Sequence, residues 1–383
     1  MAALSFWYLP MAQQHISLGN QPDGNDGDTN RIAWGKAESN FNEIYGSALS
    51  APSFRNLLIN GNFDIWQRAT SLPSAVIGQR YCADRWLTQS GGGSANSVAQ
   101  QLVTLGDTSF SSNPRYYTRV GVTSGGTTGS YATLSQKIEG AQRLSGRQAM
   151  LSFLCRTDVP KKLGIEIEVQ YGSSGSSPND SFPQGPLLDI GTVFRRYVVP
   201  ITVPALTGKT IGSGNDSTAL HFWLDSGATY AARSSGLPYQ SGWFEFAEVQ
   251  FELGAIATAF DPRPAVQELA LCQRYFERSY DLGVATGTRN ANGSVVAYMT
   301  GVPAAQYKVG SMAYFKTTKR ATPLVTPYGY ATGTPGMMTD GSGIDTSASL
   351  SVVGTGSFYI FASTSGSTTT PNTSAHWTAD AEL

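Results

Sequence analysis

The sequence KLGIEIEVQYG at residues 162–172 places an apolar side chain at every second position. These side chains are Leu163, Ile165, Ile167, Val169 and Tyr171. Because successive side chains of a strand point to opposite faces of a sheet, this period of two predicts a β-strand with one face in a hydrophobic core. The stretch is the plainest sign in the sequence that the chain is a β protein.

A second stretch, FAEVQFELG at 246–254, has the same period and predicts another half-buried strand. Its apolar members are predicted to face the core: Ala247, Val249, Phe251 and Leu253. Its polar members are predicted to face solvent as the ordinary outer face of a strand: Glu248, Gln250 and Glu252.

The segment NLLINGNFDIWQR at 56–68 also alternates. One parity carries the apolar side chains Leu57, Ile59, Phe63 and Ile65. The other parity carries the polar side chains Asn60, Asn62 and Asp64. The pattern predicts a strand with one buried face, and the Asn60-Gly61 pair, which tolerates positive φ, predicts a tight turn or a bulge within it.

Strand patterns fill residues 54–262, separated by small-residue loops such as YGSSGSSPND, and they return after residue 284. Short strands joined by such loops are typical of antiparallel sandwiches. The predicted fold is therefore mainly β, with one sandwich at 54–262 and a second β-sandwich at 284–383. An N-terminal segment at 1–53 and a linking helix at 263–283 complete the predicted order of domains.

Two helices are predicted from apolar residues spaced three and four apart. The first follows Asp28 or Thr29, with the stripe Ile32, Ala33, Ala37, Phe41, Ile44, Tyr45 and Ala48. The second is predicted to start at Pro264, where a first helical turn accepts proline, and to run for roughly four to five turns. Its stripe consists of Ala265, Leu269, Cys272 and Phe276.

Composition excludes several classes of protein. Charged residues are 14% of the 383 residues, against roughly 25% in an average soluble protein, and the net charge is −1. No basic field is present to attract nucleic acid, and the N-terminus has neither the cationic start of a signal peptide nor a membrane-spanning apolar run. The cysteines Cys82, Cys155 and Cys272 show no metal spacing and are predicted to be small core residues of a chain made in a reducing cytosol.

The N-terminus nevertheless contains four adjacent apolar residues, Phe6, Trp7, Tyr8 and Leu9. Exposing them to water is unfavourable, so they are candidates for docking onto a partner protein. Two alternatives are a strand on the chain's own domain and a translation start at Met11.

Six segments, in this order, together resemble a family of bacteriophage and prophage tail-fibre proteins. They are NLLINGNFDIWQRAT (56–70), YCADRW (81–86), FAEVQFELGAIATAFDPRP (246–264), ELALCQRYFERSYDLG (268–283), FKTTKRATPLVTPYG (315–329) and WTADAEL (377–383). The stretch at 16–46 is similar to a short module that recurs near the N-termini of tail-fibre and baseplate-associated chains. The likeness covers nearly the whole chain.

This resemblance implies an N-terminal virion-attachment segment, a jelly roll like carbohydrate-binding modules, a linking helix and a C-terminal β domain that is commonly held as a trimer. We therefore expect a virion tail protein that is made in the bacterial cytoplasm, docks to tail or baseplate proteins through residues 6–9 and binds a host-surface glycan. The homotrimer is expected to form around the stripe of Leu269, Cys272 and Phe276. The alternative is a purely structural tail, collar or connector component that meets no receptor.

Glycan-contact candidates are aromatic residues in predicted loops, because sugars pack on aromatic faces beside polar groups. They are Tyr116, Tyr239, Tyr328 and Tyr330, of which the pair Tyr328/Tyr330 in the C-terminal domain is preferred. Packing of each ring on its own loop is the alternative. The C-terminal domain is expected to face the host.

Catalysis is not expected. The histidines His15, His221 and His376 lie near no cysteine, nucleophile elbow or second metal-spaced histidine. Polysaccharide cleavage needs two carboxylates at a fixed separation, for which Asp225, Glu245 and Glu248 are the candidates, and a depolymerase is the less favoured reading. No cofactor is expected, and no metal site is assigned, although jelly rolls of this kind often hold a structural Ca²⁺, for which Asn62, Asp64 and Glu252 offer oxygen atoms.

Overall fold

The computed structural model describes residues 15–18, 26–50, 54–76, 78–367, 369 and 371–383. The chain divides into two units, residues 1–53 and 54–383. In the first unit, α1 (Asn30–Ser50) confirms the first predicted helix, and its side chains Ile32, Trp34 and Phe41 are exposed. The docking candidates Phe6, Trp7, Tyr8 and Leu9 lie outside the described residues. No helix in the described part of the chain is long and apolar enough to cross a membrane.

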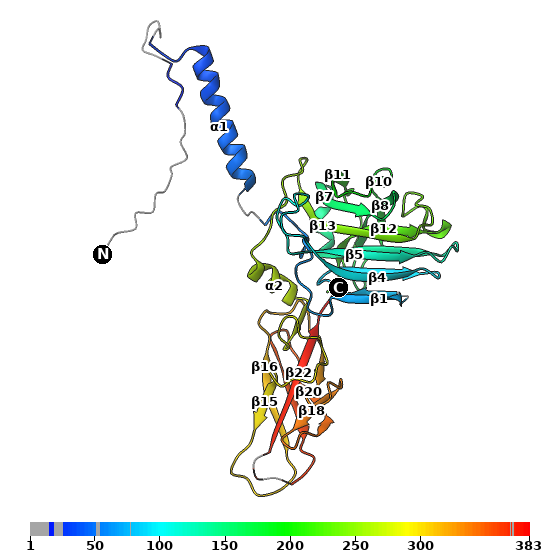
Figure 1. The fold of residues 1–383 in the computed structure, drawn as a ribbon, viewed down its shortest axis with the longest axis vertical. Coiled ribbons are helices and arrows are strands. Elements are labelled where there is room, and N and C mark those ends of the chain that lie inside the picture. The colour runs from blue at the N-terminus through cyan, green and yellow to red at the C-terminus, as the bar shows by residue number, and fades with distance from the viewer. Residues whose placement is uncertain (1–14, 19–25, 51–53, 77, 368, 370) are drawn as a thin grey trace. The chain divides into compact units, whose positions relative to one another are not determined.

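Two antiparallel sheets that enclose a common core form the first part of the second unit (Figure 1). One sheet has the order β1-β4-β5-β13-β7-β11. Its strands are β1 (Ser71–Val76), β4 (Ala95–Leu102), β5 (Tyr116–Thr123), β13 (Gly242–Leu253), β7 (Gln148–Thr157) and β11 (Arg195–Thr202).

The other sheet has the order β10-β8-β12-β6-β3-β2, with β9 pairing with β8. Its strands are β10 (Leu188–Ile190), β8 (Lys161–Gln170), β12 (Ser217–Ser226), β6 (Tyr131–Glu139), β3 (Leu87–Gly91), β2 (Gly78–Tyr81) and β9 (Asp180–Pro183). Short 3₁₀ turns occur at η1 (Ala141–Leu144) and η2 (Ala228–Tyr230). The chain passes repeatedly between the two sheets, as in a jelly roll, and the predicted mainly β fold is confirmed.

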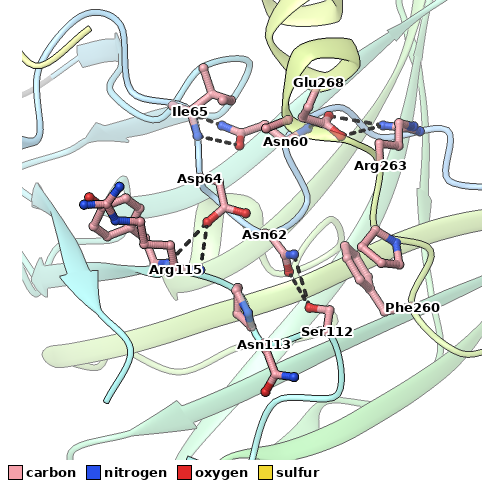
Figure 2. A pocket seen from close by; sticks show the side chains of 14 residues that line it. Asn60, Asn62, Asp64, Ile65, Ser112, Asn113, Arg115, Phe260, Arg263 and Glu268 are labelled. Carbon is pink, nitrogen blue, oxygen red and sulfur yellow. Dashed lines mark hydrogen bonds and ion pairs between the residues drawn. The ribbon is translucent and has the colours of Figure 1, made fainter. Parts of the chain in front are cut away.

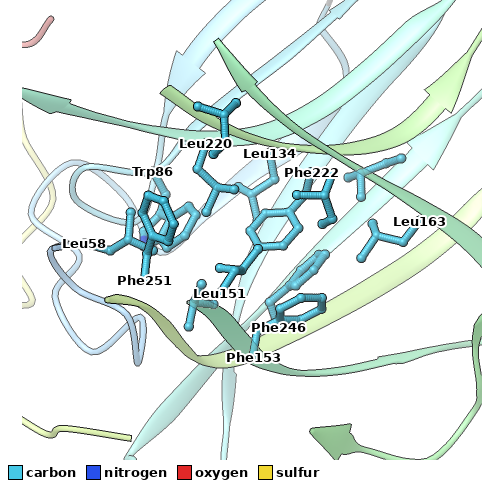
Figure 3. Packing of buried hydrophobic residues seen from close by; sticks show 14 of the residues in the cluster. Leu58, Trp86, Leu134, Leu151, Phe153, Leu163, Leu220, Phe222, Phe246 and Phe251 are labelled. Atoms are coloured by element: carbon cyan, nitrogen blue, oxygen red, sulfur yellow. The ribbon is translucent and has the colours of Figure 1, made fainter. Parts of the chain in front are cut away.

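The core lies between the sheets (Figure 3). The five apolar side chains predicted to face inward from 162–172 are all buried. Strand β8 pairs with β12 so that Ile165 lies opposite Phe222. The Phe222 ring lies 5.0 Å from Phe153 and 5.0 Å from Phe246, which joins the two sheets through aromatic contacts.

The prediction for 246–254 is partly wrong because β13 contains a bulge. The register shifts between Ala247 and Gln250, where Glu248 adopts a φ of 48°. Because of the extra residue, Ala247 lies on the outer face of the sheet, where it packs in a small separate cluster. Val249 and Phe251 remain in the core. Leu253 is exposed. The polar residues Glu248, Gln250 and Glu252 are also buried, because loops cover that face of the sheet.

The segment 56–68 is not a strand, although the predicted tight turn is confirmed. Asn60 and Phe63 have φ values of 59° and 58°, and the Phe63 amide donates to the Asn60 carbonyl at 3.0 Å. A Cβ on Gly61 would lie 2.2 Å from the Val249 carbonyl, so this turn packs directly against β13. The alternating pattern misleads here because the segment is buried on several sides at once: Leu58, Asn60 and Phe63 are all inaccessible.

The C-terminal part contains two smaller sheets. The first is built on β22 (Asn372–Asp380), which pairs with β14 (Phe276–Arg278), β15 (Val295–Tyr298), β17 (Leu324–Tyr328) and β18 (Met337–Asp340), and β19 (Asp345–Ser347) pairs with β18. The second has the order β16 (Lys308–Tyr314), β21 (Ser357–Ser363) and β20 (Ser349–Ser351). Their shared core contains Phe358, Trp377 and Met338.

The second helix is shorter than predicted. Helix α2 covers only Ala265–Gln273, and Phe276 belongs to β14, where it pairs with Asp380 of β22. Cys272 and Phe276 are buried within their own chain and Leu269 is half-buried. Two members of the predicted stripe, Cys272 and Phe276, are therefore covered by their own chain, and a trimer organised around this helix stays a prediction.

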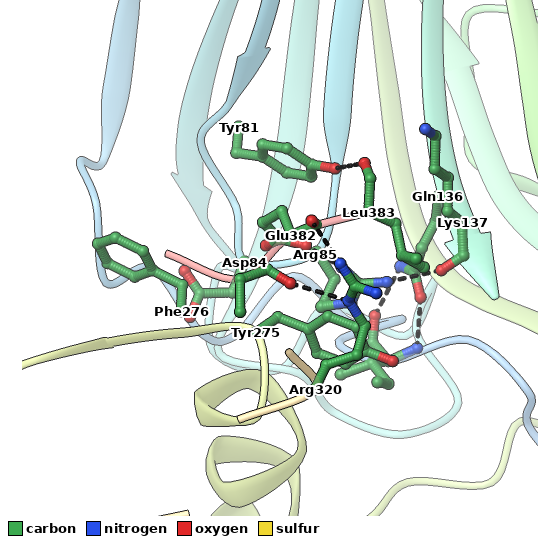
Figure 4. Close-up of polar contacts among 12 residues, drawn as sticks. Tyr81, Asp84, Arg85, Gln136, Lys137, Tyr275, Phe276, Arg320, Glu382 and Leu383 are labelled. Carbon is green, nitrogen blue, oxygen red and sulfur yellow. Dashed lines mark hydrogen bonds and ion pairs between the residues drawn. The ribbon is translucent and has the colours of Figure 1, made fainter. Parts of the chain in front are cut away.

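Polar contacts join the jelly roll to the C-terminal part (Figure 4). Arg85 forms an ion pair with Glu382, and its guanidinium carbon lies 3.4 Å from the centre of the Tyr275 ring. Arg274 pairs with Glu139 at 3.0 Å. Because both partners of the Arg85–Glu382 pair are almost fully buried, these contacts hold the last residues of the chain against the jelly roll.

The cysteines Cys82, Cys155 and Cys272 are buried, as predicted, and each is a free thiol. Burial raises the pKa of the Cys82 thiol to about 12, so this thiol stays protonated at neutral pH.

Candidate ligand-binding site

A pocket of about 400 Å³ opens at one edge of the jelly roll (Figure 2). Three segments far apart in sequence line it: residues 60–65, residues 112–116 and residues 260–268. Pockets that bind small ligands in proteins have volumes of roughly 300–1,000 Å³, so this one has room for a small part of a larger ligand.

Asn60 fixes the backbone of the first segment. Its side-chain nitrogen donates to the carbonyls of Ile65 at 2.9 Å and Asp84 at 3.1 Å, and its side-chain oxygen accepts from the Ile65 amide at 3.0 Å. Trp86 donates its indole N–H to the Asn60 carbonyl at 2.9 Å. These bonds close the loop between residues 60 and 65 and direct Asn62 and Asp64 into the pocket.

Asp64 is the central acidic group of the pocket. Its Oδ1 accepts hydrogen bonds from the backbone amides of Arg115 at 3.2 Å and Tyr116 at 3.3 Å. No described residue donates to its Oδ2. Burial raises the pKa of this carboxyl group to about 6, and the negative charge of Glu268 raises it further, whereas the two amides and the positive charge of Arg115 lower it.

Asn62 and Ser112 form a polar pair beside Asp64. The Asn62 amide lies 3.2 Å from the Ser112 hydroxyl oxygen, to which it donates. The Ser112 amide donates to Glu248 at 2.6 Å, and its hydroxyl group donates to the same carboxylate at 2.8 Å. The β13 bulge thus has a role in the site, because it places the Glu248 carboxylate where it holds the Ser112 loop.

Arg263 and Glu268 form the third side of the pocket. Arg263 Nη1 lies 3.2 Å from Glu268 Oε1 and donates to the Leu58 carbonyl at 2.9 Å. The Asn60 amide also donates to Glu268. The Glu268 carboxylate therefore has both an ion-pair partner and a backbone donor, whereas the Asp64 carboxylate has backbone donors alone.

Tyr116 and Arg115 lie at the mouth. Tyr116 is half-buried, Arg115 is exposed, and the guanidinium carbon of Arg115 lies 5.1 Å from the centre of the Tyr116 ring. An aromatic ring next to a carboxylate, an amide and a hydroxyl group is the combination that sugar-binding sites use, because the ring packs on C–H groups while the polar atoms bond hydroxyl groups.

Of the four predicted glycan-contact residues, only Tyr116 lines this pocket. Tyr239 is exposed in the loop that precedes β13. Tyr328 ends β17 and lines a different pocket, and Tyr330 is half-buried in the turn that follows. Glycan contact by any of these rings stays a prediction.

Asn62 and Asp64 meet in the pocket, but Glu252 does not join them. Its carboxylate accepts from the Thr258 amide and the Thr258 hydroxyl group, both at 2.8 Å. The three oxygen donors considered for Ca²⁺ are therefore not brought together. Among the described residues, no group of three or more His, Cys, Asp or Glu side chains is placed to hold a metal ion.

The carboxylates considered for catalysis lie outside the pocket and are held by the protein. Asp225 accepts from the Ser94 hydroxyl group at 2.7 Å and the Gln240 amide at 2.9 Å. Glu245 lies between Arg119 at 2.6 Å and Arg156 at 2.5 Å.

The two buried histidines also have protein partners. His221 lies 3.1 Å from Glu168, and His376 lies 2.9 Å from the Ser279 hydroxyl group. Burial lowers the pKa of His376.

Comparisons with known proteins identify no family. No protein-family model matches the chain, and no curated protein matches it. Among solved structures, the enzymatically active domain of bacteriophage CBA120 tailspike protein 4 is similar at 15% identity and a TM-score of 0.32, over 53% of this chain and 22% of that one.

Carbohydrate-binding modules are similar at the same distant level. A CBM4 module is 16% identical with a TM-score of 0.30, over 51% of this chain and 98% of the module. The CBM22-1 xylan-binding domain of Xyn10C from Paenibacillus barcinonensis is 13% identical with a TM-score of 0.31, over 54% of this chain and 99% of that domain.

Proposed function

We propose that this chain is a tail protein of a phage or prophage virion that attaches to a host-surface glycan, and that the pocket around Asp64 binds the glycan without cleaving it. The virion role is supported by the resemblance of residues 16–46 and of the six later segments to tail-fibre proteins. The homotrimer implied by that resemblance is part of this proposal.

The unpartnered oxygen of Asp64 carries the proposal. Burial raises the pKa of Asp64, so its ionised carboxylate is partly deprived of water and gains from hydrogen-bond donors that reach it. Among the described residues only two backbone amides do so, and both bond the same oxygen. A sugar hydroxyl group donating to Oδ2 would supply the missing bond, and hydrogen bonds to a charged acceptor are among the stronger ones.

The neighbours of Asp64 favour an uncharged ligand. Glu268 is balanced by Arg263, so the pocket has no free cation on that side for an acidic sugar. The Arg115 guanidinium faces the Tyr116 ring at the mouth, and Asn62 and Ser112 offer neutral donors and acceptors. A neutral saccharide satisfies these groups without introducing a second negative charge beside Asp64.

The state of the two carboxylates supports binding without cleavage. Hydrolysis of a glycosidic bond by the usual mechanism needs one carboxyl group as acid and a second as base or nucleophile. Glu268 is occupied by Arg263 and the Asn60 amide, so Asp64 alone offers a free oxygen to the ligand. A single carboxylate can orient a sugar but does not supply both roles.

The test is binding of the full-length chain to a printed array of neutral and acidic bacterial glycans, with Asp64→Asn and Asp189→Asn compared with wild type. Asp189 is an exposed carboxylate on β10 and serves as the matched control. We expect wild type and Asp189→Asn to bind the same neutral glycans and Asp64→Asn to lose them, with no release of reducing ends. If Asp64→Asn binds every glycan that wild type binds, the proposal is contradicted. If wild type binds no glycan on the array, the result favours a structural connector that meets no receptor.

A further inference from the structure

A second pocket, of about 310 Å³, lies on the outer face of the C-terminal sheet. On β22, Thr378 pairs with Thr326 of β17, and Asp380 pairs with Phe276 of β14 on one side and Leu324 of β17 on the other. Because strand residues two apart share a face, these five side chains lie on the same side of the sheet. The opposite side carries Val325, Trp377 and Ala379, which belong to the domain core.

Both ends of this face are closed by side chains. At one end Arg68 of the jelly roll lies over the Phe276 ring at 3.8 Å and pairs with Asp380 at 3.0 Å. At the other end the rings of Tyr328 and Tyr280 lie edge-to-face, with their centres 6.2 Å apart. The Tyr280 ring stacks on the His376 ring, with their centres 3.7 Å apart. Thr286, from the loop after β14, lines the same pocket. The pocket thus draws on the jelly roll and on three elements of the C-terminal sheet.

Two of the residues that line it contain buried polar atoms without a hydrogen-bond partner among the described residues. They are Nη1 of Arg68 and Oγ1 of Thr286. Buried polar groups in proteins are nearly always paired, so these two atoms mark an incomplete hydrogen-bond network in the wall behind the pocket. Neither atom is explained by the packing of the domain core, which lies on the other side of the sheet.

We propose that this pocket is a second saccharide site that takes a single uncharged sugar unit. The threonine hydroxyl groups both donate and accept, Asp380 accepts and Arg68 donates, which matches the alternating hydroxyl groups of a pyranose ring. Leu324 and Tyr328 provide the apolar wall on which the C–H face of the ring packs. The volume is near the lower limit of ligand pockets, which restricts the occupant to one unit or the end of a chain.

Charge excludes an acidic occupant. The only cation that lines the pocket within the described residues is Arg68, and it is already balanced by Asp380 and by Glu382 at 3.3 Å. An anionic sugar would meet two carboxylates for one guanidinium. A wholly apolar occupant is equally excluded, because it would leave the hydroxyl groups of Thr286, Thr326 and Thr378 without partners.

This site is separate from the pocket around Asp64, so the two are tested independently by using full-length Asp64→Asn as the parent. Saturation-transfer NMR is recorded with methyl glycosides of glucose, galactose and N-acetylglucosamine, and with glycerol as a small free polyol. The test variant is Thr326→Val, which removes one hydroxyl group while keeping the shape and β preference of the side chain. Thr123→Val, at the exposed end of β5, is the matched control.

We expect at least one methyl glycoside to bind the parent and the Thr123→Val control alike, and the loss of one hydrogen bond in Thr326→Val to weaken it about threefold to tenfold. Thermal unfolding of each variant shows whether the fold is retained. Equal binding by Thr326→Val, absence of binding by every glycoside, or equally strong saturation of glycerol would each overturn the assignment. Binding that persists in the Asp64→Asn parent supports this site, whether or not the pocket around Asp64 binds a glycan.

Discussion

Replacing Asp64 by asparagine is expected to stabilise the fold while it removes ligand binding. Folding raises the pKa of this carboxyl group from 3.8 to about 6, mainly because the group is buried. A raised acid pKa means that the protonated group favours the folded state and that this contribution is lost as the pH rises from about 3.8 through about 6. At about 1.4 kcal/mol per pH unit, the ionised carboxylate costs the fold about 3 kcal/mol at neutral pH. Asparagine keeps an oxygen for the two amides and carries no charge.

The assay is urea unfolding of wild type, Asp64→Asn and the control Asp189→Asn at pH 7.5 and pH 4.5. At pH 7.5 we expect Asp64→Asn to gain roughly 1–3 kcal/mol, and the gain to shrink at pH 4.5, where wild-type Asp64 is largely protonated. The control, an exposed ion pair, is expected to change stability by less than about 0.5 kcal/mol at either pH. A less stable Asp64→Asn, or a gain that is the same at both pH values, would refute the reasoning.

Three further predictions concern the fold. Glu382→Gln leaves Arg85 buried without its counter-charge and is expected to destabilise the protein by about 3–5 kcal/mol in urea unfolding; an unchanged midpoint would show that the pair does not hold the junction. Phe222→Ala removes a fully buried ring between the sheets and is expected to cost about 3–5 kcal/mol in the same assay, whereas a loss below about 1 kcal/mol would contradict the core described. Gly61→Ala places a Cβ 2.2 Å from the Val249 carbonyl and is expected to lower the thermal midpoint and weaken glycan binding together, so normal binding in a stable variant would place the turn outside the site.

Sequence periodicity identifies β8 and the mainly β fold because five apolar side chains at 162–172 occupy one face without interruption. It fails at 246–254 because no residue in the sequence of this stretch marks the position of the bulge. Glutamate is an unusual residue for the φ of 48° that Glu248 adopts, and nothing in the local sequence announces it. It fails at 56–68 because alternation cannot distinguish a strand from an irregular segment that is enclosed by other elements. The helix at 264 ends early because Phe276 gains a strand partner about one hundred residues away, in β22.

The pocket around Asp64 was accessible to sequence reasoning only in part. Asn62 and Asp64 stand out as polar residues within an apolar stretch, and Tyr116 stands out as a loop aromatic. What joins them is tertiary: the Ser112 loop is held by Glu248 of β13, and Arg263 and Glu268 arrive from a segment about two hundred residues further along the chain. Contacts between such distant segments leave no periodic signal, which is why Ser112, Arg263 and Glu268 were missed.

The most direct test of the central claim is isothermal titration of the full-length protein with the neutral glycan that binds best on the array, at pH 7.5 and pH 5.0. If the ionised Asp64 carboxylate accepts the sugar hydroxyl group, the apparent affinity follows the ionised fraction of this group, which falls to about one tenth at pH 5.0 for a pKa of about 6. We therefore expect binding to weaken about tenfold at pH 5.0 in wild type and Asp189→Asn, and to be weak at both pH values in Asp64→Asn. Affinity that is independent of pH, or that is retained in Asp64→Asn, would contradict the claim that this pocket binds the glycan through Asp64.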